Sequence, residues 1–179
     1  MKTAFLALSC ATLLATGPAL AGAMDLTVAE AVVIDAEGNE LGTLSLTQTE
    51  EGVTIAGVLD GIPEGMHGFH YHETGVCDPA TGFESAGGHL APRGNQHGFE
   101  DPEGPHAGDM YNQAANADGQ MDLNVNNDMV SLLDGEEGNL LDEDGSAVMI
   151  HANADDYSTD PGGDSGARIA CGVIEPTEI

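Results

Sequence analysis

The chain has 179 residues, enough for one domain, and it carries 31 acidic residues against three lysine or arginine residues. The formal net charge of −28 disfavours nucleic acid and anionic membranes as partners, so we expect neither. The acidity indicates either a protein exposed to salt or a compositional bias of its lineage, and both possibilities stay open.

The N-terminus has the organisation of a secretory signal peptide: a lysine, an apolar run and then small residues. Cleavage would follow Ala21 or Ala23, and both positions stay open. We therefore expect a leader at 1–23 and one mature domain at 24–179. No other apolar run approaches the length of a membrane span, so we expect the mature protein to be soluble.

The cysteine content agrees with export. Cys10 falls inside the expected leader and would be removed with it. Cys77 and Cys171 remain, an even pair in a protein sent to an oxidising compartment. The sequence therefore predicts a disulfide between them, which would tie a loop region to the last strand.

Eight short strand-like runs follow the leader, separated by turns rich in glycine and acidic residues. Apolar and polar side chains alternate clearly in 41–46 and 121–126. The expected strands are 26–34, 41–47, 53–59, 67–72, 120–126, 129–133, 147–151 and 168–174. Since no helical period is convincing, we predict an all-β fold, an eight-stranded antiparallel Greek-key β-sandwich or barrel of immunoglobulin-like type with two long functional loops.

Six of the seven histidines occur in a pattern that a two-metal site explains. His70 and His72 are two residues apart, so in a strand their side chains point to the same face and can grip one ion. His151 ends an apolar run and would reach that ion from a neighbouring strand. A long glycine- and proline-rich stretch, which a metal would order, contains the remaining candidates, His89, His97, His106 and Asp109.

The ligand types separate two ions. A tetragonal set of imidazoles favours Cu(II), whereas three histidines and one carboxylate form a closed tetrahedral set for zinc. The strand histidines therefore predict a copper-like site and the loop residues a zinc-like site. Each set is one ligand short unless a deprotonated His89 serves both ions through its two ring nitrogens. The alternative is six unconnected histidines with ordinary structural roles.

At these residues the chain resembles the copper/zinc superoxide dismutases, specifically their bacterial periplasmic branch. The resemblance covers essentially everything after the leader, in both the order and the spacing of the motifs. The matching segments are 66–73 (MHGFHYHE), 75–77 (GVC), 85–90 (SAGGHL), 97–98 (HG), 106–109 (HAGD), 150–157 (IHANADDY) and 166–174 (GARIACGVI).

The resemblance implies one copper and one zinc ion per subunit. The implied copper ligands are His70, His72, His89 and His151, and the implied zinc ligands are His89, His97, His106 and Asp109. It also implies that Asp155 links the copper ligand His70 to the zinc ligand His97 and orients both rings. His67 matches a family position that is not a ligand.

The implied activity is the disproportionation of superoxide to molecular oxygen and hydrogen peroxide in the periplasm. Copper would cycle between two oxidation states, and the His89 bridge would open and take up a proton when copper is reduced. Arg168 matches the family's arginine that attracts and orients the anion. We therefore expect His89 and Arg168 to be the catalytic residues, while we assign no chemistry to Arg93. The short second loop lacks the glutamate–lysine guidance cluster of eukaryotic relatives.

Two other functions compete with this one. A periplasmic module that binds copper or zinc without turnover would have no need of all four copper histidines together with Arg168. An acidic interaction protein that uses the fold as a scaffold leaves the histidines without a role. The oligomeric state stays open between a monomer and a homodimer.

Overall fold

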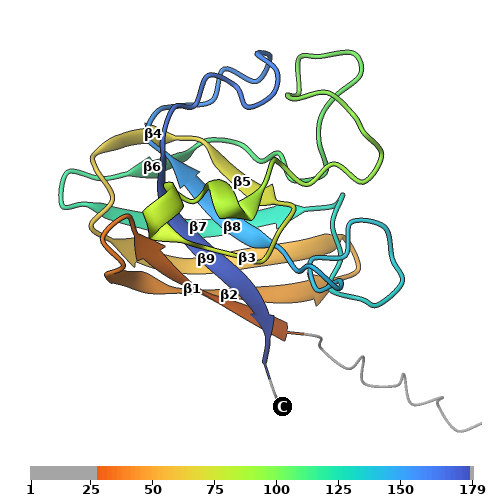
Figure 1. The fold of residues 1–179 in the computed structure, drawn as a ribbon, viewed down its shortest axis with the longest axis horizontal. Helices are drawn as coiled ribbons and strands as arrows, with labels where there is room; N and C mark the ends of the chain where they lie inside the picture. Colours follow the sequence, from red (N-terminus) through yellow and green to blue (C-terminus); the bar gives the residue numbers. More distant parts are fainter. Residues whose placement is uncertain (1–27, 178–179) are drawn as a thin grey trace, which may run out of the picture.

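The structure, a computed structural model, describes residues 28–177 and consists of nine antiparallel strands in one sheet that curls into a nearly closed barrel (Figure 1). The expected leader at 1–23 lies outside the described residues. The strands are β1 (Val28–Asp35), β2 (Glu40–Thr49), β3 (Gly52–Asp60), β4 (Gly65–His67), β5 (Phe69–His72), β6 (Gln113–Ala115), β7 (Gln120–Asn127), β8 (Ala147–His151) and β9 (Arg168–Pro176). The all-β prediction is confirmed.

The strand order β4-β6-β7-β3-β2-β1-β9-β8-β5 explains how the barrel closes. Its two edge strands, β4 and β5, are consecutive in the chain and are separated only by Gly68. The Gly68 carbonyl accepts a hydrogen bond from His151 N at 2.9 Å, and its amide donates to Asn153 O at 2.8 Å. A side chain at Gly68 would come within 2.8 Å of Ser165 Cβ, so the close approach requires glycine. The chain thus crosses from one edge of the sheet to the other beside the histidines.

Side chains from alternate strand positions fill the barrel interior. On β5, Phe69 and Tyr71 point inward and are fully buried. Burial raises the pKa of Tyr71, whose hydroxyl has no hydrogen-bond partner among the described residues. Because neighbouring strand residues point to opposite faces, His70 and His72 lie on the outer face of the barrel.

The strand pattern differs from the prediction at three places. The expected strand 67–72 is divided at Gly68, and the short strand β6 has no counterpart among the expected strands. The start of the expected strand 26–34 is not one of these differences, because residues 26 and 27 lie outside the described residues and β1 is described from Val28 onward. The third difference is the segment 129–133, which is a loop in the structure.

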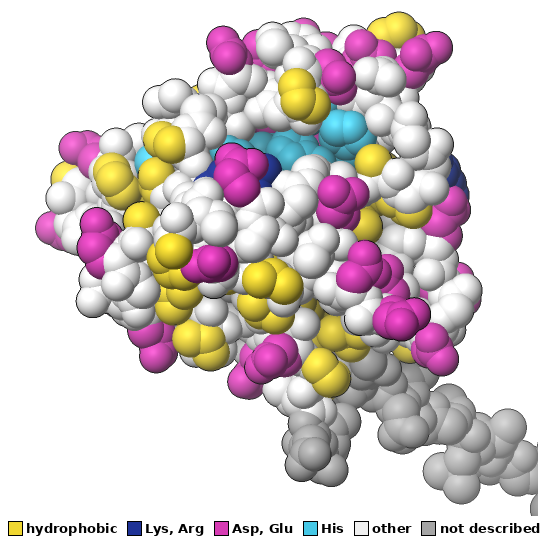
Figure 2. Space-filling model, viewed as in Figure 1, with side chains coloured by type: hydrophobic (Ala, Val, Ile, Leu, Met, Phe, Trp, Pro, Cys, Tyr) yellow, Lys and Arg dark blue, Asp and Glu magenta, His cyan; other side chains and the backbone are white. Residues whose placement is uncertain are grey.

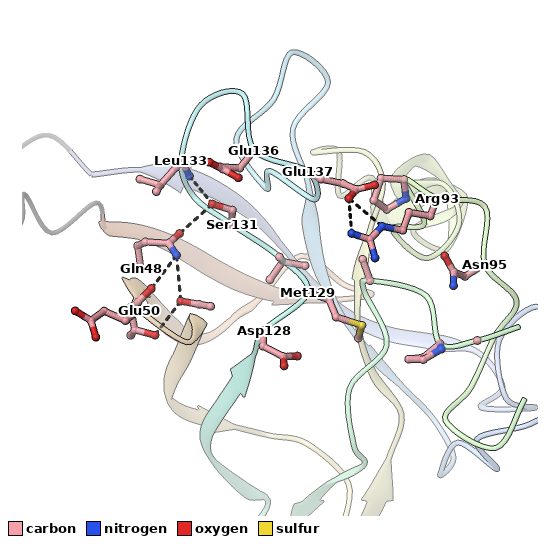
Figure 3. Close-up of a pocket in the computed structure, with 17 residues that line it drawn as sticks. Gln48, Glu50, Arg93, Asn95, Asp128, Met129, Ser131, Leu133, Glu136 and Glu137 are labelled. Carbon is pink, nitrogen blue, oxygen red and sulfur yellow. Dashed lines mark hydrogen bonds and ion pairs between the residues drawn. The ribbon is translucent and has the colours of Figure 1, made fainter. Parts of the chain in front are cut away.

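The middle of the loop at 129–133, residues Val130 to Leu132, is buried without being a strand. Val130 and Leu132 pack into the core, and the segment makes only an isolated bridge from Ser131 to Asn139. The Gln48 side chain takes the place of a neighbouring strand, because its Oε1 accepts hydrogen bonds from Leu132 N at 2.7 Å and Ser131 Oγ at 3.2 Å. Figure 3 shows Gln48 beside Ser131, with the hydrogen bond that joins the two side chains. The apolar pattern of 129–133 therefore predicts correctly that Val130 and Leu132 are buried, but it predicts wrongly that the segment pairs with a neighbouring strand.

Two long loops leave the barrel on the histidine side (Figure 1). The first, 73–112, joins β5 to β6 and contains two short 3₁₀ helices, η1 (Pro79–Thr81) and η2 (Glu84–Ala86). The second, 152–167, joins β8 to β9. The predicted disulfide Cys77–Cys171 is present, with a Cα–Cα distance of 5.7 Å, and it fastens the first loop to β9. Among the described residues no helix has the length and apolarity to span a membrane.

Candidate metal centre

Three histidines from paired strands form the first group. His70 and His72 project from the outer face of β5, and His151 ends the adjacent strand β8. All three are buried, and each ring is hydrogen-bonded to a residue of one of the two long loops, Asp155, Gly87 or Gly166. The His70 and His151 ring centroids are 4.9 Å apart. The two-residue spacing thus produces the shared face that the sequence predicted.

The hydrogen bonds of these three rings leave one nitrogen of each without a partner. His70 Nε2 donates to Asp155 Oδ2 at 2.6 Å, and His72 Nδ1 and His151 Nδ1 donate to the Gly87 and Gly166 carbonyls at 3.0 and 3.1 Å. The opposite nitrogens, His70 Nδ1, His72 Nε2 and His151 Nε2, are buried without a partner among the described residues. Since carboxylate and carbonyl oxygens only accept, each of these rings keeps a free lone pair, as a metal ligand must.

His89 lies between this group and a second one. An isolated bridge to His72 brings it from the first loop to β5, and its ring stacks on His70 with centroids 4.0 Å apart. Its Nδ1 lies 2.8 Å from Asp109 Oδ1. It completes two sets of four residues whose potential ligand atoms lie within 4.8 Å of one another, His70-His72-His89-His151 and His89-His97-His106-Asp109.

The second set converges on a single carboxylate oxygen. The Nδ1 atoms of His89, His97 and His106 lie 2.8, 3.1 and 3.3 Å from Asp109 Oδ1. The edge of a tetrahedron around zinc is about 3.3 Å long when each ligand bond is about 2.0 Å, so this spacing fits a small tetrahedral ion. Asp109 Oδ2 accepts hydrogen bonds from the backbone amides of Gly98 and His106, both at 2.9 Å, and these bonds aim Oδ1 at the rings.

Asp155 lies between the two sets and is hydrogen-bonded to one histidine of each. Its Oδ2 accepts the bond from His70, and its Oδ1 lies 3.0 Å from His97 Nε2. Asn112 holds the Asp155 backbone on both sides, with Asp155 N to Asn112 Oδ1 at 2.7 Å and Asn112 Nδ2 to Asp155 O at 2.8 Å. No sequence signal predicts this role for Asn112, because an isolated asparagine before a short strand is common in turns of any protein.

The electrostatics of the site favour neutral ligands in the first set. Burial lowers the pKa of His151 to about 3 and that of His89 to about 4, and it also lowers the pKa values of His70 and His72. These rings are therefore neutral at about pH 7, with one N–H and one free lone pair each, the form that binds transition metals.

The second set behaves differently. Burial lowers the pKa of His97, but hydrogen bonds to Asp109 and Asp155 outweigh burial and raise it to about 9. The same kind of bonds hold the pKa values of Asp109 and Asp155 below the usual range, although burial opposes this. An ion at the second set would thus replace a proton as the partner of these carboxylates.

Arg168, at the start of β9, is held in place by two backbone carbonyls of the first loop. Its Nη1 donates to Phe83 O at 2.6 Å and its Nη2 to Gly87 O at 2.7 Å. Phe83 is fully buried and has a positive φ of 63°, an unusual conformation for a bulky residue, which directs its carbonyl to the guanidinium. The positive charge helps to lower the pKa values of His72 and His151, so it lies close to the first set.

A hollow of about 470 Å³ opens over these residues. Figure 2 shows histidine side chains at its floor, with an acidic side chain in front of dark blue at its lower edge. The charged residues that line the hollow are Arg168, Glu84, Asp160 and Asp164, and the histidines are His72, His89, His106 and His151. A small anion that enters this hollow therefore passes one arginine and three carboxylates before it reaches the histidines of the first set.

The remaining candidates have structural contacts. His67 Nδ1 and Nε2 lie 2.7 and 2.8 Å from the carbonyls of His151 and Pro63, so this ring connects β4 to the end of β8. Arg93 pairs with Glu137 at the molecular surface, as Figure 3 shows, and belongs to neither set of potential ligands.

Known proteins are similar to this chain in sequence and in fold. The profile of the copper/zinc superoxide dismutase (SODC) family matches residues 40–174. The chain is 46% identical to Superoxide dismutase [Cu-Zn] 2 of Aquifex aeolicus over 147 residues, covering 82% of this chain and 85% of that protein. It is 40% identical to Superoxide dismutase [Cu-Zn] of Caulobacter vibrioides, with the same coverage. The crystal structure of a SOD-like protein from Bacillus subtilis has a TM-score of 0.76 at 43% identity, covering 80% of this chain and 95% of that one.

Proposed function

The chain belongs to the copper/zinc superoxide dismutase family, and from this premise we propose which of its residues hold the two metals. It disproportionates superoxide to molecular oxygen and hydrogen peroxide, with copper and zinc as cofactors. The proposed copper ligands are His70, His72, His89 and His151, and the proposed zinc ligands are His89, His97, His106 and Asp109. The observation that carries this assignment is the set of three buried ring nitrogens without partners, which face one another beside the shared His89.

Copper, when bound, supplies the one-electron redox chemistry, and zinc supplies fixed charge and geometry because it has no redox chemistry of its own. Arg168 binds the incoming anion, since two backbone carbonyls hold its guanidinium beside the copper ligands. His89, the ring between the two sets, holds a proton on its Nε2 during one half of the cycle and returns it in the other. Asp155 keeps the His70 and His97 rings in fixed orientations.

Two further proposals concern the place of action. Residues 1–23 act as a secretory leader, residues 24–179 form the enzyme domain, and the enzyme works in the periplasm. The Cys77–Cys171 disulfide supports this location, because such bonds persist in oxidising compartments. The charge of −28 disfavours nucleic acid and anionic membranes as partners.

Elemental analysis of single variants tests the ligand assignment. His151→Ala removes a ligand of copper only, so we expect a large loss of copper with zinc retained. Asp109→Ala removes a ligand of zinc only, so we expect zinc to be lost while most copper remains. Normal copper content in His151→Ala would overturn the assignment, and unchanged zinc in Asp109→Ala would overturn its second half.

A further inference from the structure

We propose that the hollow above the histidines is also an uptake path for hydrated divalent metal ions, and that the carboxylates Glu84, Asp160 and Asp164 speed the loading of copper from solution. This inference rests on the proposed function, because the histidines beneath the hollow must be the copper ligands. It adds to the enzyme a metal-capturing surface whose charge works against its own anionic substrate.

The first observation is the charge at the edge of the hollow. The three carboxylates are exposed and line it from both loops, Glu84 from the first and the two aspartates from the second. The opposing charge is Arg168, and its two terminal nitrogens already donate to the Phe83 and Gly87 carbonyls. Glu84 Oε2 lies only 3.6 Å from Arg168 Nη2 and offsets much of that positive charge. The edge therefore attracts cations more than anions.

The second observation is independent of the charge. His72 Nε2 and His151 Nε2 belong to residues that line the same hollow, are buried, and have no hydrogen-bond partner among the described residues. A cation held loosely by carboxylate oxygens at the edge thus meets free imidazole nitrogens below. Copper(II) binds imidazole far more strongly than carboxylate and water, so transfer proceeds inward.

Coulomb's law gives the direction and the approximate size of the effect of one carboxylate on the local concentrations of copper and superoxide. At about 7 Å in water, one carboxylate raises the local concentration of a divalent cation by up to about sevenfold and lowers that of a monovalent anion by up to about threefold. Salt of about 0.15 M reduces both effects, because the Debye length is then about 8 Å. The same side chains therefore accelerate metal uptake and slow the approach of superoxide, with opposite salt dependences.

The test compares copper uptake by the metal-free full-length mature protein with uptake by the double variant Glu84→Gln/Asp164→Asn. Asparagine suits the positive φ of 51° at Asp164, and neither residue is a proposed ligand. A matched control, Glu51→Gln/Asp122→Asn, removes the same charge from exposed positions that do not line the hollow. Stopped-flow absorbance would follow the appearance of the copper–histidine band after mixing with copper(II) sulfate at low and high NaCl.

We expect the double variant to load copper about threefold to tenfold more slowly than wild type at low salt. The difference should shrink at high salt, and the control should load like wild type. The final copper content should be equal in all three proteins. Once loaded, the double variant should consume superoxide at least as fast as wild type.

Equal loading rates in the double variant and wild type, with full final copper, would overturn the uptake path and leave the proposed function intact. An equal slowing in the control would overturn it too, because the effect would then come from net charge alone. Failure of wild type to bind copper through its histidines would overturn both this inference and the ligand assignment.

Discussion

At the scale of single residues, the site depends on which ring nitrogen of each histidine carries a proton. Backbone carbonyls of Gly87 and Gly166 fix His72 and His151, and the Asp155 carboxylate fixes His70. Each acceptor binds one nitrogen and leaves the other free to bind an ion. The metal chemistry therefore depends on residues that would never touch a metal.

Asp155 offers the sharpest test of this dependence. Asp155→Asn keeps the size of the side chain but loses the charge shared by His70 and His97, whose nitrogens lie 2.6 and 3.0 Å from it. We expect the affinity for zinc, and to a smaller degree for copper, to fall by about 10- to 100-fold. Competition with a chelator, followed by elemental analysis, would measure both. Unchanged affinities would mean that the ligands orient themselves without this carboxylate.

The shifted histidines predict how the stability of the metal-free protein depends on pH. His89 and His151 have folded pKa values of about 4 and 3, below the unfolded value of about 6.5. The unfolded chain therefore binds more protons in this range, and the free energy of unfolding falls as pH decreases below about 6.5.

His97 acts in the opposite direction. Its pKa is raised to about 9, so the folded state holds the extra proton, and its stabilising contribution is lost as pH rises through about 9. We expect maximal stability of the metal-free protein near about pH 6.5, measured by urea unfolding between about pH 4 and about pH 9.5. Bound zinc should reduce the loss of unfolding free energy at alkaline pH, because it takes the place of the proton on His97. A steady rise of stability throughout this range without zinc would contradict this assignment.

At the scale of elements, the two long loops are fastened to each other and to the barrel at a few points. Gly98 lies against the second loop so closely that a side chain there would come within 2.0 Å of Tyr157 O. Glu100 N donates to the same carbonyl at 3.1 Å. Phe83 packs with Met149 and the cysteines in a small cluster beneath the disulfide. These contacts hold the two long loops, which carry His89, His97, His106, Asp109 and Asp155, against each other and against β8 and β9.

The disulfide should make a large contribution to stability. It closes a span of 94 residues, for which the loop-entropy model gives roughly 4–5 kcal/mol. We expect the variant Cys77→Ser/Cys171→Ser to lose about 2–5 kcal/mol of unfolding free energy, measured by urea unfolding with the metals removed from both proteins. Mass spectrometry of the non-reduced wild type should find neither thiol free. A loss below about 1 kcal/mol would show that the loop is held mainly by its other contacts.

At the scale of the whole molecule, the charge distribution sets how superoxide arrives. The chain has 31 acidic residues and only Lys2, Arg93 and Arg168 as lysines or arginines. Arg93 is paired with Glu137, and Arg168 stands beside Glu84. No wide positive surface guides the substrate over the described residues, so its attraction is confined to the immediate surroundings of Arg168.

The salt dependence of turnover follows from this distribution. Added salt screens the many distant carboxylates at least as much as the nearby arginine. We expect kcat/KM for superoxide to stay flat or to rise between low and marine-level NaCl, measured by pulse radiolysis or stopped flow. A steep fall with ionic strength would reveal an attractive funnel that these side chains do not provide.

The sequence by itself determined the fold class and the disulfide, and it indicated the residues that we propose as metal ligands. The two-residue periodicity of strands put His70 and His72 on one face, and the even cysteine pair matched export. The spacing of the other histidines and the family motifs indicated which residues belong together. Strand alternation depends on residues that are neighbours in the chain, and a disulfide can be expected from the number of cysteines, so both can be predicted from the sequence.

Only the tertiary structure decided how the pieces meet. Pairing of β5 with β8, and the crossing at Gly68, bring His151 to a strand some eighty residues earlier. The role of Asn112, the Phe83 carbonyl at Arg168 and the position of Glu84 depend on contacts between loops without periodicity. The prediction of a strand at 129–133 is wrong because an apolar pattern records burial and not the hydrogen-bond partner. The hydrogen bonds of this segment come from the Gln48 side chain and from the nearby loop residues Gly138 and Leu140. Such contacts join distant residues, and no local preference encodes them.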